Sequence, residues 1–290
     1  MTDLTTSFYR AAELIAGADA LVIGAGAGMG VDSGLPDFRG REGFWNAYPA
    51  LARAKLDFTQ VANPATFEKD PMLAWGFYGH RLDLYRKTVP HEGFQILRKW
   101  SEEMMFGSWI FTSNVDGQFQ KAGFADDQIH ECHGSIHHFQ CKERCERTVW
   151  SADGFMPHIN EDACHLTNEP PTCSACGSLA RPNILMFGDW NWLESRTRAQ
   201  SRREDQWLYT VESARARVVI VELGAGTAIP SVRHFSHSII SQYDGRLIRI
   251  NPQESQVPGS ADVSIPKSAL EGLLGIQSAL DEVKGRGHDN

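Results

Sequence analysis

The sequence predicts an α/β fold in which a parallel sheet carries an inserted, smaller module. Short apolar runs with the character of buried strands alternate with stretches of helical spacing, as in parallel-sheet proteins. Glycine-rich turns follow two of these runs, at 24–28 and 224–226. Between residues 139 and 180, two close cysteine pairs and several prolines interrupt the alternation. With 290 residues, of which 42% are hydrophobic, the chain can bury a substantial core.

Apolar spacing in the first half of the chain predicts helices and strands in turn. A helix over 5–16 has its apolar residues on one face and ends at Gly17. The elements expected after it are a strand over 20–23, a helical and aromatic stretch over 45–89 in which Pro71 opens a helix, a helix over 96–105, and strands over 108–112 and 129–133. Polar residues follow several of these strands, and parallel sheets bind ligands at that edge.

The second half predicts further strands and the division of the chain. Buried strands are expected over 183–187, 218–223 and 247–250, and an amphipathic helix over 268–283. We assign 1–44, 90–138 and 181–290 to the sheet domain, and 45–89 and 139–180 to the smaller module. The last two segments are separated out because their patterns fit a parallel sheet poorly.

Charge and apolar patterning exclude several classes of partner. The chain has 28 basic and 36 acidic residues, a formal net charge of −8. This balance argues against binding to nucleic acid or to an anionic membrane surface. No apolar stretch of 18 residues occurs, and the N-terminus lacks a basic segment followed by a continuous apolar one. We therefore expect a soluble, unexported, cytoplasmic protein with no membrane partner.

The glycine-rich stretch GAGAGMGVDSGLPDFRG, residues 24–40, directly follows a predicted strand. Backbone N–H groups in such a turn bind phosphate oxygens well, because glycine has no Cβ in the way. The strict dinucleotide fingerprint of hydride-transfer enzymes fails in every register, since Met29, Val31 and Ser33 occupy the position of its third glycine. No lysine follows to make a phosphate loop of the NTPase type. The stretch therefore indicates nucleotide binding and disfavours an oxidoreductase.

Two cysteine pairs, Cys141 with Cys145 and Cys173 with Cys176, have the close spacing of metal ligands. In an unexported protein such pairs bind metal more often than they form disulfides, and four thiolates suit tetrahedral Zn²⁺ in a structural role. Two alternatives stay open. The cysteines are unrelated thiols with some redox sensitivity, or Cys164-His165 replaces one pair. The smaller module is thus predicted to be helical and zinc-binding.

Three strings in the chain resemble the signatures of one family. GAGMGVDSGLPDFRG (26–40) resembles the nucleotide-binding signature of the sirtuin (Sir2-like) family of NAD-dependent protein deacylases. TSNVDGQFQKAG (112–123) is similar to its second signature and CHGS (132–135) to its catalytic histidine strand. The resemblance spans roughly residues 12–275 and looks like a divergent bacterial-type branch. It implies a Rossmann-like NAD-binding domain and an enzyme that turns NAD and an acylated protein or peptide into nicotinamide, O-acyl-ADP-ribose and free lysine.

The resemblance also implies roles for particular residues. His133 matches the general base for a ribose hydroxyl, and Asn114 and Asp116 match catalytic ligands of the ribose, a bound water and the nicotinamide amide. A neutral imidazole suits a base near pH 7; the two short polar residues equally suit an Asx-type turn. The implied cofactor-binding residues are Gly26, Ala27, Gly28, Val31, Asp37, Phe38, Arg39, Ser113, Asn114, Asp116, Gly224, Ala225, Gly226 and Asn251.

Substrate residues are implied in two places. Tyr78 and Arg81 match a pair with which some sirtuins recognise succinyl or malonyl lysine, and a cationic fork beside a phenol suits a carboxylate. The plain alternative is an ordinary aromatic residue and a solvated arginine on an exposed helix. Phe187 and Gly188 resemble the edge against which the family lays an extended peptide. Trp190 and Trp192 either flank the acyl-lysine channel or pack in the core.

Departures from the family pattern leave rival functions open. Gly30 stands where the family usually has serine, and Ser113 where it has glutamine. The later glycine turn, GAGTAIP, is slightly shorter than the family's, and HEGF (91–94) lacks the histidine of the family's N-x-x-H turn. A protein ADP-ribosyltransferase or NAD glycohydrolase on the same fold, and a module that senses NAD without turnover, are therefore the alternatives to deacylation.

Overall fold

The structure is a computed structural model that describes residues 3–36, 40–145 and 148–286. Its elements up to residue 131 are α1 (Leu4–Ala16), β1 (Ala20–Ala25), α2 (Gly28–Val31), α3 (Gly40–Ala47), α4 (Pro49–Arg53), α5 (Phe58–Val61), α6 (Pro64–Lys69), α7 (Pro71–Lys87), α8 (Glu92–Glu103), β2 (Ser108–Thr112), α9 (Gln118–Lys121), η1 (Asp126–Gln128) and β3 (Ile129–Glu131). The later elements are β4 (Gly134–Cys141), β5 (Val149–Ser151), β6 (Ile159–Asn160), β7 (His165–Leu166), β8 (Ala180–Ile184), α10 (Ser195–Ser213), β9 (Val218–Leu223), α11 (Ser231–Tyr243), β10 (Arg246–Ile250), β11 (Val263–Ile265) and α12 (Ala269–Arg286).

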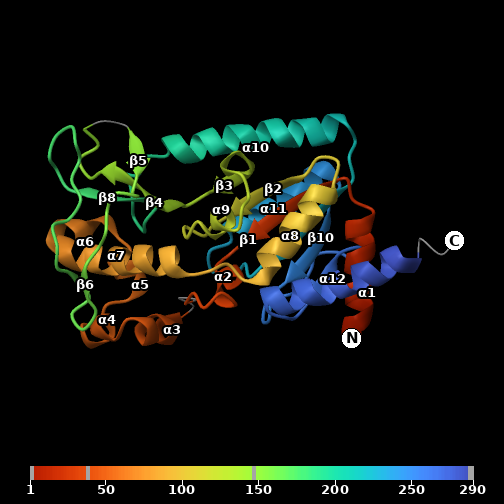
Figure 1. Cartoon of the computed structure of the whole chain (residues 1–290), viewed down its shortest axis with the longest axis horizontal. Coiled ribbons are helices and arrows are strands. Elements are labelled where there is room, and N and C mark those ends of the chain that lie inside the picture. Colours follow the sequence, from red (N-terminus) through yellow and green to blue (C-terminus); the bar gives the residue numbers. More distant parts are fainter. Residues whose placement is uncertain (1–2, 37–39, 146–147, 287–290) are drawn as a thin grey trace.

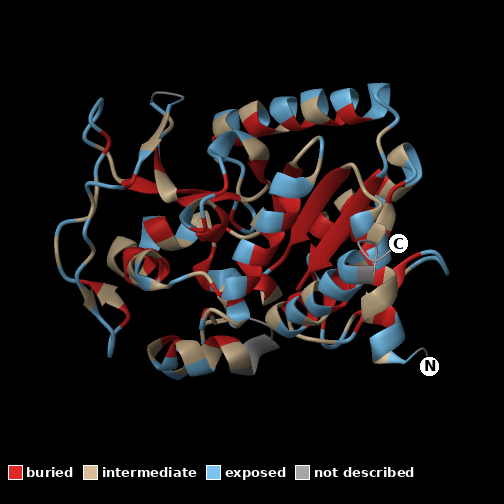
Figure 2. Ribbon diagram, turned by 45° about the vertical axis from the view of Figure 1, so that its right-hand side comes forward, coloured by how far each residue is buried: buried red, intermediate tan, exposed pale blue. Residues whose placement is uncertain are grey.

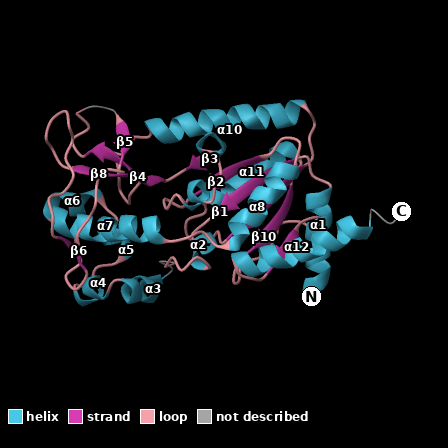
Figure 3. Cartoon of the chain, viewed as in Figure 1, coloured by secondary structure: helices cyan, strands magenta, loops and turns pink. Residues whose placement is uncertain are grey.

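Within these residues, a six-stranded parallel sheet has the order β11-β10-β9-β1-β2-β3 (Figures 1 and 3). The first strand of the sheet in the sequence is β1, and β2 and β3 are added in order on one side of it. The later strand β9 pairs with the other side of β1. The strand order therefore reverses between β1 and β9, and open parallel sheets bind ligands at the carboxyl edge of such a reversal. The predicted parallel sheet is confirmed.

The strands of this sheet are largely buried (Figure 2), and their alternating apolar side chains pack on both of its faces. In β1, Leu21 and Ile23 pack in one cluster with apolar residues of α1, α8 and α12. Ala20 and Val22 point the other way and pack with residues of α10 and α11. Because successive side chains of a strand face opposite sides, a continuous apolar run is what a sheet covered on both faces requires.

The edge strand β3 is covered by α10, which replaces the missing neighbour strand with side chains. Gln200 Oε1 accepts a hydrogen bond from the backbone N–H of Glu131 at 3.1 Å, and Thr197 Oγ1 donates to the Glu131 carbonyl at 3.2 Å. Farther along, Glu204 contacts His130 Nδ1 at 3.0 Å. The first half of the buried face of α10 is therefore polar, and its bonds to the backbone of Glu131 hold the strand that precedes His133.

The smaller module lies beside the carboxyl edge of the sheet (Figure 1). Helices α3 to α7 pack on strands β4, β5 and β8, which form an antiparallel sheet in this part of the described chain. Trp75 of α7 is fully buried and donates its indole N–H to the Ala180 carbonyl at 3.0 Å. The helical character expected for 45–89 is confirmed, and the four domain boundaries stay predictions.

The strand observed in this region, β8, differs in its bounds from the strand that the sequence predicted over 183–187. The strand β8 ends at Ile184 and pairs antiparallel with β4, which begins directly after His133. Gly134 makes this junction possible: it has a φ of 81°, and a Cβ there would lie 2.0 Å from the Asn183 carbonyl oxygen. Residues 185–187 follow the strand and lead into a turn. Their apolar side chains line the cavity described below.

The longest helices act as cover layers: α10 has 19 residues, α12 has 18 and α7 has 17. Across the described ranges, no helix combines the length and the apolar character needed to cross a bilayer. The cytoplasmic location expected from the sequence stays a prediction.

The close packing at Gly76 of α7 gives a prediction about stability. At this position the helix lies against the backbone of Cys164 and His165. A Cβ on Gly76 would lie 1.9 Å from the Cys164 carbonyl oxygen. Alanine in a helix normally stabilises by about 1 kcal/mol over glycine, but overpacking here should reverse that gain. We expect Gly76→Ala to lower the free energy of unfolding by about 2 kcal/mol, measured by denaturant unfolding.

The matched control for this substitution is Gly285→Ala in α12. A Cβ there meets nothing within 4 Å, so the change should be neutral or slightly stabilising. Equal stability of Gly76→Ala and the unmodified protein would contradict the close packing of α7.

Candidate active site

A cavity of about 670 Å³ opens at the carboxyl edge of the sheet, between the sheet and the smaller module. The turns after β1, β2 and β9 contribute to its wall, together with α7 and the turn after β8. The residues expected from the sequence that line it are Gly26, Ala27, Tyr78, Arg81, Ser113, Asn114, Asp116, His133, Phe187, Gly224, Ala225 and Gly226. Segments far apart in the chain thus meet in one cavity.

Other expected residues lie outside the lining. Gly28 donates its backbone N–H to the Gly224 carbonyl at 3.1 Å, and buried Asn251 donates its side-chain N–H to the Ala225 carbonyl at 3.0 Å, so both hold the second glycine turn. Val31 is 41% exposed on α2, and Gly188 lies exposed in the turn after β8. Asp37, Phe38 and Arg39 fall outside the described residues.

The two glycine turns lie against each other, backbone to backbone. A Cβ on Gly26 would be 2.7 Å from the Ala225 Cα. Gly224 has a φ of 58°, and a Cβ on it would be 2.4 Å from the Gly28 carbonyl carbon. Glycine is therefore required at these positions for the turns to meet, a constraint separate from the room that a phosphate needs.

His133 stands at the junction of the two sheets and faces the cavity. Its Nε2 lies 3.2 Å from the Ser231 hydroxyl at the start of α11. Burial lowers the pKa of His133 below its usual value, and a hydrogen bond with the Ser113 backbone offsets part of this shift. The ring is therefore neutral near pH 7 and able to accept a proton.

Asn114 and Asp116 are held by backbone contacts at the end of β2. The Asn114 side chain donates to the Gly26 carbonyl at 3.0 Å, which ties this turn to the first glycine turn. Asp116 Oδ1 accepts the backbone N–H of Gln118 at 2.9 Å, an Asx-type contact. Burial raises the pKa of Asp116 to about 6. The carboxyl is thus poised to change its charge near neutral pH.

Tyr78 and Arg81 lie on the face of α7 that lines the cavity. Arg81 is only 7% exposed, so the alternative of a solvated arginine on an exposed helix is wrong. Its Nε donates to the Tyr85 hydroxyl at 2.9 Å, and its guanidinium carbon lies 5.3 Å from the ring centres of Phe77 and Tyr85. Burial raises the pKa of Tyr78, which keeps the phenol protonated beside this cation.

The turn after β8 is built on a buried ion pair. Arg181 donates to Asp189 at 2.7 and 3.0 Å, and Asp189 also accepts the backbone N–H groups of Met186 and Asn191. The turn leaves Trp190 92% exposed, so this residue does not pack in the core. The backbone N–H of Phe187 is already bonded to the Ala62 carbonyl at 2.9 Å.

Four cysteines gather in the smaller module, as their spacing suggested. The sulfur atoms of Cys141, Cys145, Cys173 and Cys176 all lie within 4.8 Å of one another, with Cys145 and Cys173 at 3.5 Å and Cys141 and Cys176 at 3.7 Å. A tetrahedral zinc ion with Zn–S bonds of about 2.3 Å separates its sulfurs by roughly 3.8 Å. The cluster therefore fits a structural zinc ion. Among the described residues, Cys164 and His165 are not part of this cluster, so the alternative in which they replace one cysteine pair is wrong.

Sequence reasoning missed residues that hold the second glycine turn. Arg233 of α11 donates to the Ala225 carbonyl at 2.9 Å, and Glu254 accepts the backbone N–H of Thr227 at 2.8 Å. Ser231, which contacts His133, was also missed. These residues lie in no recognised motif; the only signal for Ser231 is its position after Pro230, where a helix is expected to begin.

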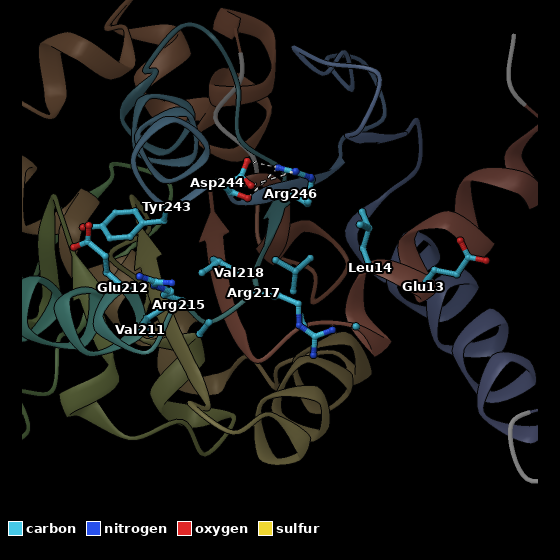
Figure 4. Close-up of a pocket in the computed structure, with 14 residues that line it drawn as sticks. Glu13, Leu14, Val211, Glu212, Arg215, Arg217, Val218, Tyr243, Asp244 and Arg246 are labelled. Carbon is cyan, nitrogen blue, oxygen red and sulfur yellow. Dashed lines mark hydrogen bonds and ion pairs between the residues drawn. The ribbon is translucent and has the colours of Figure 1, made fainter.

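A second cavity of about 490 Å³ lies at the opposite edge of the sheet, where β1, β9 and β10 begin (Figure 4). Two of its arginines have acidic partners: Arg217 with Asp19 at 2.9 Å, and Arg246 with Asp244 at 2.8 Å. None of the residues expected from the sequence lines it. The chemistry-bearing side chains are in the first cavity.

Comparison with known proteins gives a consistent result. A family model described as "Sir2 family" matches residues 26–208. The NAD-dependent protein deacylase of Aquifex aeolicus is 30% identical over 260 residues, which are 90% of this chain and 95% of that protein. The enzyme of the same name from Thermococcus kodakarensis is 31% identical over 262 residues, 90% of this chain and 91% of that protein.

Solved structures resemble this chain over nearly its full length. A Sir2 homologue in complex with NAD has a TM-score of 0.67 at 26% identity, covering 93% of each chain. A mutant Sir2 homologue in complex with ADP-ribose has a TM-score of 0.68 at 26% identity, covering 94% of this chain and 96% of that one.

The raised pKa of Asp116 predicts how stability depends on pH. A carboxyl whose pKa rises from 3.8 to about 6 on folding favours the folded state below about pH 4, and this contribution is lost as the pH rises through 6. At about pH 8 the buried charge is a cost of about 1–3 kcal/mol. Asp116→Asn keeps the acceptor for Gln118 and should be more stable by that amount, measured by denaturant unfolding.

This stability gain should shrink as the pH falls and vanish near pH 4. The exposed Asp205→Asn on α10 is the control and should change stability by less than about 0.5 kcal/mol at either pH. A gain at Asp116 that does not vary with pH would show that the carboxylate is not penalised by burial.

Proposed function

This chain belongs to the Sir2 family, and on that premise we propose that its central cavity carries out NAD-dependent removal of acyl groups from protein lysines. The products would be nicotinamide, O-acyl-ADP-ribose and free lysine. The observation that carries the proposal is the convergence of His133, Asn114 and Asp116 with both glycine turns on one cavity. Chemistry at a ribose needs a neutral base beside fixed polar groups, and this arrangement provides both.

The cavity suits NAD at its sheet edge. NAD would supply a glycosidic bond that breaks to release nicotinamide and leaves C1′ open to the acyl oxygen. Gly26 and Ala27 would face the diphosphate, and Gly224, Ala225 and Gly226 would border it from the neighbouring turn. Asn251 would act by holding that second turn through the Ala225 carbonyl. The roles of Gly28 and Val31 toward NAD, and those of Asp37, Phe38 and Arg39, rest on the family resemblance.

We assign His133 the role of the base that removes a proton from a ribose hydroxyl. Its contact with Ser231 supports this role, because it puts a hydroxyl at hydrogen-bond distance from Nε2. Asn114 would orient the ribose while its own side chain is fixed on the Gly26 carbonyl. Asp116 and Ser113 would contact the nicotinamide and ribose side of the cofactor.

The acylated peptide would enter beside the turn after β8. Phe187 lines the cavity and is 37% exposed, so it would border the acyl-lysine, with Gly188 next to the peptide backbone. Tyr78 and Arg81 would lie at the inner end, where the acyl group arrives. A buried cation there favours an acyl chain that carries a carboxylate.

The experiment that tests the function incubates the protein with NAD and peptides whose lysine is unmodified, acetylated, succinylated or long-chain acylated. We expect nicotinamide release that depends on an acylated peptide, with loss of that acyl mass from the peptide. Release without a change in the peptide would instead favour an NAD glycohydrolase. A gain of ADP-ribose mass would favour a transferase, and NAD binding without release would favour a sensor.

His133→Ala is the paired variant in this experiment. It should lower deacylation by at least about 10²-fold, because general-base catalysis contributes on that scale, while NAD binding stays within a few-fold. Retained turnover would remove His133 from the mechanism.

Arg81 gives a separate prediction about acyl specificity. Arg81→Met keeps most of the apolar stem of the side chain but removes the guanidinium charge, so it should lower desuccinylation about tenfold or more and deacetylation far less. The ratio of the two kcat/KM values measures this. Equal losses for both peptides would mean that Arg81 supports the fold of the cavity wall and does not read a carboxylate.

A further inference from the structure

His91 lies behind the first glycine turn, just before α8, where its ring and its backbone N–H make three hydrogen bonds. Its ring Nε2 lies 2.9 Å from the Met29 carbonyl, and its backbone N–H donates to the Ser33 hydroxyl at 2.9 Å. Its Nδ1 accepts the backbone N–H of Gly93 at 3.0 Å, which caps the helix. Met29 and Ser33 belong to the glycine-rich segment, so one residue joins that segment to α8.

These bonds fix the ring in one chemical form. Because Gly93 donates to Nδ1, that nitrogen carries no proton, and the proton on Nε2 is donated to Met29. Burial lowers the pKa of His91, which favours this neutral form, although the nearby Asp32 opposes the shift. The ring also packs on Gly93, where a Cβ would lie 2.6 Å from the His91 Cε1, so only glycine leaves room for it.

The backbone of the glycine-rich segment connects the His91 contacts to the cavity wall. Gly30 directly follows Met29, and its carbonyl accepts the backbone N–H groups of Ser33 at 3.0 Å and Leu35 at 3.1 Å. The Leu35 side chain covers Gly30 so closely that a Cβ there would be 2.9 Å from its Cδ1. Leu35 lines the cavity at one end of the segment and Gly26 at the other, whereas His91 does not line it.

We propose that His91 is a positioning residue for NAD: it holds residues 26–35 in the shape that binds the cofactor, without touching the cofactor itself. The inference rests on the proposed function, since it takes NAD as the occupant of the cavity. The His91 ring has two tasks: it caps α8 through Nδ1 and holds the Met29 carbonyl through Nε2. The two tasks can be separated by substitution.

The experiment compares three variants by thermal unfolding, by calorimetric titration with NAD, and by steady-state kinetics. His91→Ala loses both tasks. His91→Asn keeps the cap, because asparagine is among the best capping residues, but is too short to reach Met29 as well. Lys99→Gly is the control: it weakens the same helix from its exposed side without touching the glycine-rich segment.

We expect both His91 variants to weaken NAD binding by about five- to tenfold, with a matching rise in KM for NAD. Their kcat and their KM for the acylated peptide should stay within about twofold. His91→Asn should unfold near the temperature of the unmodified protein, whereas His91→Ala and Lys99→Gly should unfold lower. Lys99→Gly should bind NAD normally.

Two results would overturn the inference. If His91→Asn restores NAD affinity together with thermal stability, His91 is only a helix cap. If Lys99→Gly weakens NAD binding as much as His91→Ala does, general loosening of α8 is the cause. Binding is measured apart from turnover, so a protein that binds NAD but does not deacylate still tests His91, whereas failure of the unmodified protein to bind NAD would end both proposals.

Discussion

The contact on which the rest of the site depends is the backbone-to-backbone approach of the turns after β1 and β9. The parallel register pairs Ala25 with Leu223, so both strands end at the same level and their turns must share one space. Gly26 and Gly224 make this possible, because a side chain on either would overlap the other turn. The remaining parts of the cavity attach to this pair: Asn114 bonds to the first turn, and Asn251 and Arg233 bond to the second. A nucleotide would therefore meet a wall that is formed before it arrives.

The buried charged side chains around this contact determine the shape of the cavity wall more than they stabilise the fold. The Arg181–Asp189 pair is almost fully buried, and removing two charges from water offsets much of their attraction. What the pair achieves is geometric, because Asp189 also accepts two backbone N–H groups and so defines the turn after β8. Arg81 is a similar case: the rings of Phe77, Tyr78 and Tyr85 surround its guanidinium, and its hydrogen bond to the Tyr85 hydroxyl helps to hold this buried cation at the cavity wall.

The sequence was most informative where one physical signal dominated. The apolar runs at 20–23, 108–112 and 218–223 predicted buried parallel strands because a sheet covered on both faces needs no alternation. The cysteine spacing predicted the cluster for a similar reason, since metal geometry limits where ligands lie. The helix α10 was missed because the first half of its buried face is polar: Thr197, Gln200 and Glu204 look like surface residues until the strand that they contact is known. Ser231 and His91 depend on tertiary contacts with distant segments, which no local pattern encodes.

The side chains that α10 directs at β3 have a consequence beyond catalysis. An uncovered outer strand offers a row of N–H and C=O groups to any passing extended chain, and such edges start fibril growth and domain exchange. Here Gln200 and Thr197 already occupy both backbone groups of Glu131, so a foreign strand finds no ladder to extend at that point. The same helix that steadies the histidine junction thereby blocks strand pairing at Glu131, and a shortened α10 would expose these backbone groups to another chain.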